Sequence, residues 1–206
     1  DDKIFTKLYV ALVRPHLEYA QASWSPQYEC DILELEKVQN RATKQLPGYK
    51  EKPYEERLKM LKLPTLKFRR SRGDMIEMYK IISYNNLYDP QVSGFITMRE
   101  DKVDYKVNLK GHNKKLYSKM AKKIFRIKSF APRINDMWNE LDEYIVHAPS
   151  LNAFKNRLDI YWSKQDFLYD FTKKYNKKKI TYHHIGRNQK KNSDRNYHVL
   201  NIYLIH

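Results

Sequence analysis

Apolar side chains recur every three or four residues through most of the first 83 positions. This spacing places them on one face of a helix that has 3.6 residues per turn. It predicts helices over 3–19, 31–46, 53–61 and 65–83. The predicted apolar stripe of the second helix consists of Ile32, Leu35, Val38, Ala42 and Leu46. Pro15 should kink or interrupt the first helix, and Pro47 followed by Gly48 should end the second.

Two more helical stripes follow in the second half of the chain. One is made of Ile134, Trp138 and Leu141, and the other of Phe154, Leu158 and either Tyr161 or Trp162. Ser150 is placed to cap the second of these helices, and residues 167–175 are expected to extend it. The two stripes should face each other or the first helical unit. Trp138 is therefore expected in the core, not at a surface where nucleic-acid bases stack.

The pattern predicts a mainly α fold with four parts. Residues 2–83 form a helical bundle-like unit, 84–123 a basic connector, 124–172 a smaller C-terminal helical module and 173–206 a basic tail. At most a minor β element is expected within 91–110, because Val103, Tyr105 and Val107 alternate with polar residues as in a strand. The tail is expected to be disordered, because blocky basic segments rarely bury enough apolar surface to fold.

The charge of the chain favours a polyanionic partner. Forty Lys and Arg residues against 24 Asp and Glu residues give a formal net charge of +16. Four cations cluster within the predicted helix 65–83, where arginines can grip phosphates with two parallel hydrogen bonds. They are Lys67, Arg69, Arg70 and Arg72. The alternative is a solvated helix face whose cations pair with Asp74 and Glu77.

A second basic stretch, residues 106–128, contains no acid and is interleaved with aromatic residues such as Tyr117 and Phe125. Basic residues among aromatics are typical of nucleic-acid contact and base stacking. The candidate contacts in this stretch are Lys114, Lys115, Lys122, Lys123 and Arg126. The alternative is a connector whose aromatics anchor it to the core.

Several sequence words resemble the C-terminal region of reverse transcriptases from non-LTR (LINE-type) retrotransposons, in order as well as in spelling. In the first half they are LVRPHLEYA (12–20), WSP (24–26), LEKVQ (35–39), RATK (41–44), PG (47–48), YEERL (54–58), LP (63–64), RR (69–70) and RGDMI (72–76). In the second half they are GH (111–112), KL (115–116), SF (129–130) with Arg133, WN (138–139) with Leu141, APS (148–150) and FKNRLD (154–159). The chain departs from this pattern at Lys110, where Arg is usual, and at Asp142, where Pro is usual.

The resemblance implies a mainly α fold: a helical bundle-like thumb unit at 2–83 followed by a smaller C-terminal helical module. The parent protein would be an RNA-directed DNA polymerase encoded by a transposable element. This chain would be a non-catalytic part of it that positions the template–primer duplex of RNA and DNA through backbone contacts. The implied partners are that duplex and the upstream polymerase palm, without a membrane. The implied location is intracellular, in cytoplasm and nucleus.

Catalytic chemistry of this class requires carboxylates that hold two divalent ions. The resemblance places them in an aromatic-x-Asp-Asp word, and the sequence contains none. Mg²⁺ is therefore expected only in the palm, no cofactor or metal site is expected in this chain, and the chain alone should not extend a primer. The single cysteine, Cys30, indicates a reducing compartment. A helical protein-interaction scaffold and a decayed retroelement copy without activity remain the alternatives.

Overall fold

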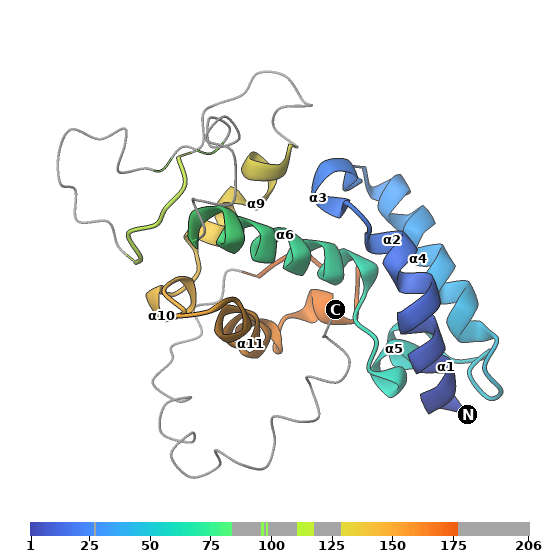
Figure 1. The fold of residues 1–206 in the computed structure, drawn as a ribbon. Helices are drawn as coiled ribbons and strands as arrows, with labels where there is room; N and C mark the ends of the chain where they lie inside the picture. Colours follow the sequence, from blue (N-terminus) through green and yellow to red (C-terminus); the bar gives the residue numbers. More distant parts are fainter. Residues whose placement is uncertain (27, 84–95, 97, 99–110, 118–128, 177–206) are drawn as a thin grey trace, which may run out of the picture.

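The structure is a computed structural model that describes residues 1–26, 28–83, 96, 98, 111–117 and 129–176 (Figure 1). It confirms a mainly α fold. The described residues contain no strand and one isolated antiparallel bridge, between Met98 and Leu116. The main helices are α4 (Glu29–Lys44), α5 (Tyr54–Leu61), α6 (Leu66–Ser83), α9 (Phe130–Asn139) and α11 (Leu151–Trp162). The predicted strand at 103–107, most of the connector and most of the tail lie outside the described residues.

The first helical segment is interrupted near Pro15, as the sequence predicts. It consists of α1 (Asp2–Leu8), a π-helical turn η1 (Tyr9–Val13) and α2 (Arg14–Glu18). Pro15 lies in the first turn of α2, where its missing N–H is tolerated. The wider π-helical turn lies directly before it, which is where a proline ring would clash with the backbone of a regular helix. A short helix, α3 (Gln21–Trp24), then leads toward α4.

Helix α4 turns a different face inward from the one that its apolar stripe predicts. Its buried side chains are Glu36, Gln39 and Thr43, whereas Val38 is 38% exposed. Ile32 and Leu35 are only partly buried. At the C-terminal end of the stripe, Leu46 is 7% exposed and belongs to a hydrophobic core, against which Ala42 packs. The predicted stripe is therefore correct at that end and wrong for Val38. Helix α4 also starts at Glu29, two residues before the predicted start at 31, with Tyr28 as its N-cap.

A buried hydrogen-bond network explains how α4 can turn polar side chains inward. The Gln39 amide accepts a hydrogen bond from the hydroxyl of Tyr9 (3.0 Å) and donates to the Tyr54 hydroxyl (3.1 Å) and the Pro64 carbonyl (3.0 Å). The Tyr54 hydroxyl donates to Glu36 (2.8 Å), which also accepts the backbone N–H of Lys67 (2.8 Å). Buried polar groups are tolerated when they are paired in this way. The network joins η1, α4, α5 and the start of α6.

Helix α6 runs through the middle of the described fold (Figure 1). Thr65 caps its first turn by accepting the N–H of Phe68 (3.1 Å), and its own hydroxyl donates to the Phe167 carbonyl (2.9 Å). The larger core joins apolar side chains of α6, among them Phe68, Met75 and Met78, to α9, α10 (Glu143–Val146) and α11. A smaller core lies around α1, η1 and α5. The larger core thus contains residues from both sides of the predicted boundary at 83.

The C-terminal helices pack as the two stripes predict. Trp138 of α9 is fully buried, and its ring lies 6.0 Å from that of Phe154 of α11, which confirms Trp138 as a core residue. Ser150 caps α11 by accepting the N–H of Ala153 (3.2 Å). The expected extension of α11 is wrong: a separate 3₁₀ turn, η3 (Asp166–Leu168), follows it. Phe167 in that turn packs against Phe68, which makes the turn part of the larger core.

Candidate nucleic-acid interface

The three predicted arginines of α6 lie inside the fold. Arg69, Arg70 and Arg72 are each no more than 5% exposed. Lys67 is partly buried, and its ammonium donates to the carbonyls of Phe171 (2.7 Å) and Lys173 (3.0 Å). Burial lowers the pKa of Lys67. The four cations therefore do not form one exposed helix face.

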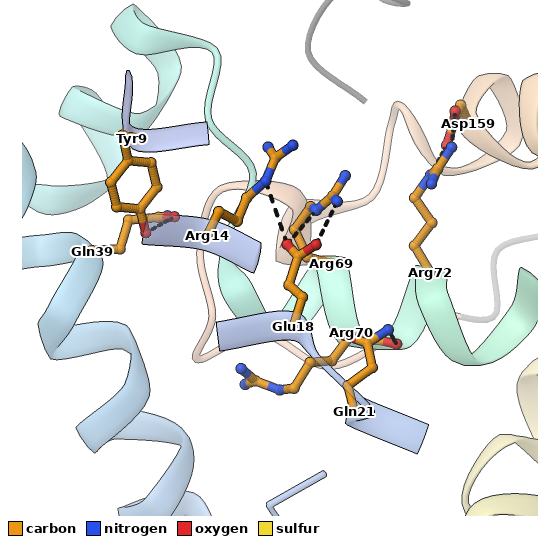
Figure 2. A network of polar contacts seen from close by, with 9 residues as sticks. All are labelled: Tyr9, Arg14, Glu18, Gln21, Gln39, Arg69, Arg70, Arg72 and Asp159. Carbon is orange, nitrogen blue, oxygen red and sulfur yellow. Dashed lines mark hydrogen bonds and ion pairs between the residues drawn. The ribbon is translucent and has the colours of Figure 1, made fainter. Parts of the chain in front are cut away.

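Arg69 is held by a carboxylate from α2. Its guanidinium donates two hydrogen bonds of 2.7 Å to the two oxygens of Glu18 (Figure 2). Arg14, on the same helix as Glu18, lies 3.6 Å from that carboxylate. Burial, followed by the repulsion of Arg69, lowers the pKa of Arg14 to about 10. One carboxylate thus serves two buried arginines and fixes α2 against α6.

Two further bidentate pairs attach α6 to the C-terminal helices. Arg72 donates to both oxygens of Asp159 on α11, at 2.6 and 2.8 Å (Figure 2). Asp74 of α6 accepts from Arg133 on α9, at 2.8 and 2.9 Å. Arg133 also donates to the carbonyl of Ala22 in α3 (3.1 Å). These pairs cross between parts of the chain that are distant in sequence.

Arg70 differs from Arg69 and Arg72 because no carboxylate of the described residues lies within hydrogen-bond distance of its side chain. Its two terminal nitrogens are buried and have no hydrogen-bond partner among the described residues. Burial lowers the pKa of Arg70, and the nearby charges of Glu36 and Asp74 oppose that effect. Its backbone carbonyl accepts from the side-chain amide of Gln21 (3.4 Å; Figure 2).

Gly73 shows why α3 can approach α6 so closely. A Cβ atom at this position would lie 1.5 Å from the side-chain nitrogen of Gln21. A glycine inside a helix costs about 1 kcal/mol of stability relative to alanine. Close packing is thus one physical reason for a glycine in the middle of α6.

The sequence did not reveal where the arginines of α6 would lie. The alternative of a solvated face is wrong for Arg69 and Arg72, because their partners are Glu18 and Asp159 and not Asp74 or Glu77. Contact of Arg69 and Arg72 with phosphate stays a prediction. Such contact would cost free energy, because each arginine would first have to leave its buried ion pair. The sequence contained one indication of these partners, because Glu18 and Asp159 both lie in segments quoted above for the resemblance, 12–20 and 154–159.

Lys114 and Lys115 lie on a segment that is fastened to α9. The indole N–H of Trp138 donates to the carbonyl of Lys114 (2.8 Å). The side chain of Asn139 accepts from the N–H of Leu116 (2.7 Å) and donates to its carbonyl (3.0 Å). Both lysine side chains are partly exposed. Lys122, Lys123 and Arg126 lie outside the described residues, so their relation to this segment stays a prediction.

His112 anchors the same segment from inside. The side chain is fully buried, and its Nε2 lies 3.1 Å from the carbonyl of Trp138. A carbonyl only accepts, so Nε2 carries the proton in the neutral ring. Nδ1 is buried without a hydrogen-bond partner among the described residues. Burial lowers the pKa of His112 to about 4, because a second proton would place an unpaired charge there.

Acidification from pH 7 to 4.5 should lower the free energy of unfolding of the wild type by about 2 kcal/mol more than that of His112→Gln. The pKa of His112 is about 4 in the folded state and about 6.5 in the unfolded chain, so the unfolded state binds more protons in this window. The stability that the neutral, buried His112 contributes is fully present above pH 6.5 and is lost as the pH falls toward 4. Urea unfolding at both pH values measures it. The exposed His147→Gln is the control, and an equal fall in His112→Gln would contradict the assignment.

Other kinds of site find no support in the part of the chain that the structure describes. No group of three or more His, Cys, Asp or Glu side chains there could hold a metal ion. No helix within the described ranges is long and apolar enough to cross a bilayer. Comparisons of the chain with protein-family models, curated proteins and solved structures gave no match.

Proposed function

We propose that this chain is a non-catalytic helical module of the type that follows the palm in non-LTR retrotransposon reverse transcriptases. Its role is to position a template–primer duplex for the RNA-directed DNA polymerase through contacts to the nucleic-acid backbone. The supporting observation is spatial: sequence words that resemble this family, although far apart in the chain, meet in bidentate ion pairs. The compartments proposed for it are cytoplasm and nucleus, where such a polymerase would act.

Three of these pairings support the proposal. The word at 12–20 meets the word at 69–70 through Glu18 and Arg69. The word at 72–76 meets the word at 154–159 through Arg72 and Asp159, and it meets Arg133 through Asp74. Charged residues of these words therefore have a structural task, since a buried ion pair requires both partners in one geometry. A module with this architecture does not need those arginines at its surface.

The positive charge that is not neutralised by interior carboxylates is available to bind nucleic acid. The whole chain carries +16, and several of its arginines are neutralised by interior carboxylates. Most of the surplus is carried by other cations, mainly lysines, which act as point charges for phosphate. We assign the backbone contacts to five of them: Lys114, Lys115, Lys122, Lys123 and Arg126. They belong to one acid-free stretch, 106–128.

Duplex binding should be nearly independent of sequence and should fall with salt, with a log–log slope of roughly −0.9 per phosphate neutralised on B-DNA. Changing the five assigned cations to glutamine should weaken binding to every duplex alike and flatten that slope. Fluorescence anisotropy with DNA and RNA–DNA duplexes over a salt series measures both. The matched control replaces five exposed cations elsewhere: Arg41, Lys44, Lys50, Lys62 and Lys164.

A truncation separates the contribution of residues 1–176 from that of residues 177–206. Removing residues 177–206 keeps Asn176, whose backbone exchanges hydrogen bonds with the side chain of Gln165 (3.0 and 3.1 Å). The proposal expects the truncated chain to retain salt-dependent binding. If truncation abolishes binding while the five substitutions leave it unchanged, the folded part is not a nucleic-acid clamp.

A protein-interaction scaffold is the second candidate function. It is favoured by a separate observation, the concentration of exposed apolar side chains in the first 38 residues. A scaffold without nucleic-acid binding would show no salt-dependent duplex affinity in the truncated chain. The two functions are compatible in one module, since they are assigned to different residues.

A further inference from the structure

Exposed large hydrophobic side chains are unevenly distributed over the molecule. Of the twelve in the described residues, nine lie within the first 38 positions. They are Ile4, Leu8, Leu12, Val13, Tyr19, Trp24, Tyr28, Leu33 and Val38. Scattered exposed apolar residues are normal, whereas several on one helix face indicate an interaction surface.

Ile4, Leu8 and Leu12 form a regular feature within this group, here called the N-terminal stripe. They follow one another at intervals of four residues along α1 and η1 and are 58%, 53% and 63% exposed. The inward side of the same segment is satisfied by other residues. Tyr9 is buried in the smaller core and donates its hydroxyl hydrogen to Gln39. The stripe is therefore not needed for the packing of the described fold.

The chemistry of the stripe favours a protein as its occupant. Its side chains are aliphatic, so they offer neither an aromatic face for base stacking nor a hydrogen bond to a nucleotide. A helix laid along such a stripe would meet apolar anchors at a spacing of four residues, which is how amphipathic helices are recognised.

The charges beside the stripe indicate which protein chemistry fits. Lys3 and Lys7 directly precede Ile4 and Leu8, are exposed, and form no ion pair with any described residue. Exposed cations along the edge of an apolar stripe complement acidic side chains along the edges of a partner. A second copy of this chain is the poorer occupant, because two molecules of charge +16 repel each other.

We propose that the N-terminal stripe docks an amphipathic helix of a protein partner whose apolar face is bordered by acidic residues. The leucines and Ile4 supply the apolar contact, and Lys3 and Lys7 set the preference for acid. The proposal uses none of the cations assigned to nucleic acid, so it does not rest on the function proposed above.

The test uses the full-length chain and two labelled synthetic helices with the same leucine face, one bordered by glutamates and one by lysines. Fluorescence anisotropy should show the glutamate helix binding at least about tenfold more tightly than the lysine helix. The variant Leu8→Gln/Leu12→Gln should weaken that binding by about tenfold or more, as expected for central apolar anchors. The matched control is Met60→Gln, which alters a residue of α5 that is 48% exposed, and it should bind like the wild type.

The charged residues need their own variant, because a basic protein attracts any acidic peptide. Lys3→Gln/Lys7→Gln should raise the Kd of the glutamate helix and reduce its salt dependence, while duplex binding stays at the wild-type level. Circular dichroism of each variant confirms that the helices are intact. Equal binding to the Leu8→Gln/Leu12→Gln variant and the wild type would overturn the proposal. So would a wild-type dimer in sedimentation that this variant abolishes, since the occupant would then be a second copy.

Discussion

Asp159→Ala should lower the free energy of unfolding by about 3–5 kcal/mol. The substitution removes the only carboxylate that pairs with Arg72 in the described part of the chain and leaves that guanidinium buried, since Arg72 is only 5% exposed. A buried cation without a partner costs far more than the pair contributed, because water cannot replace the lost oxygens. Urea unfolding followed by circular dichroism gives the free energy.

Two comparisons make this result specific to the buried pair. Glu55→Ala breaks the exposed pair with Lys59 on α5 and should cost less than about 1 kcal/mol. The double variant Arg72→Met/Asp159→Leu removes both charges and should recover most of the loss of Asp159→Ala. If Asp159→Ala costs no more than Glu55→Ala, Arg72 does not depend on Asp159 for its burial.

Gln39→Ala should destabilise the protein by about 3 kcal/mol, whereas Val38→Ala should cost less than about 1 kcal/mol. Gln39 is 1% exposed and makes three hydrogen bonds, so its loss leaves Tyr9 and the Pro64 carbonyl buried without partners. Val38 is 38% exposed. The apolar pattern of α4 predicts the opposite order, with Val38 as the more important residue.

Thermal and urea unfolding of both variants decide between the two descriptions of α4. Gln39→Glu is a useful third variant, because it retains the size of the side chain but places a charge near Glu36 in the interior. It should be at least as damaging as Gln39→Ala. A larger loss in Val38→Ala than in Gln39→Ala would show that α4 packs through its apolar stripe.

The positions of several helices follow from local rules and were predictable. Helices α5 and α6 lie within a residue of the ranges predicted from apolar spacing, and Ser150 caps α11 as its side chain suggests. Pro15 interrupts the first helical segment for a reason that concerns only its own ring and missing N–H. Such features depend on neighbouring residues, so a sequence pattern contains the relevant information.

The candidate site was less predictable because its meaning depends on distant partners. The sequence shows Arg69 and Arg72 as part of a cationic cluster. The same residue pattern is compatible with a surface position and with an interior position. Glu18 and Asp159 decide between these, and they lie 51 and 87 residues away in the chain. The same holds for His112, which is buried because Trp138 provides its acceptor.

The sequence by itself determined a mainly α chain, the location of its main helices, its strongly basic charge and the lack of an aromatic-x-Asp-Asp word. Tertiary structure alone decided that α4 buries Gln39 and leaves Val38 partly exposed, and that the arginines of α6 lie inside. The physical reason is that periodicity identifies which residues share a helix face but not which face is buried. That choice depends on whether partners from elsewhere in the fold satisfy the polar groups, as Tyr9 and Tyr54 do for Gln39.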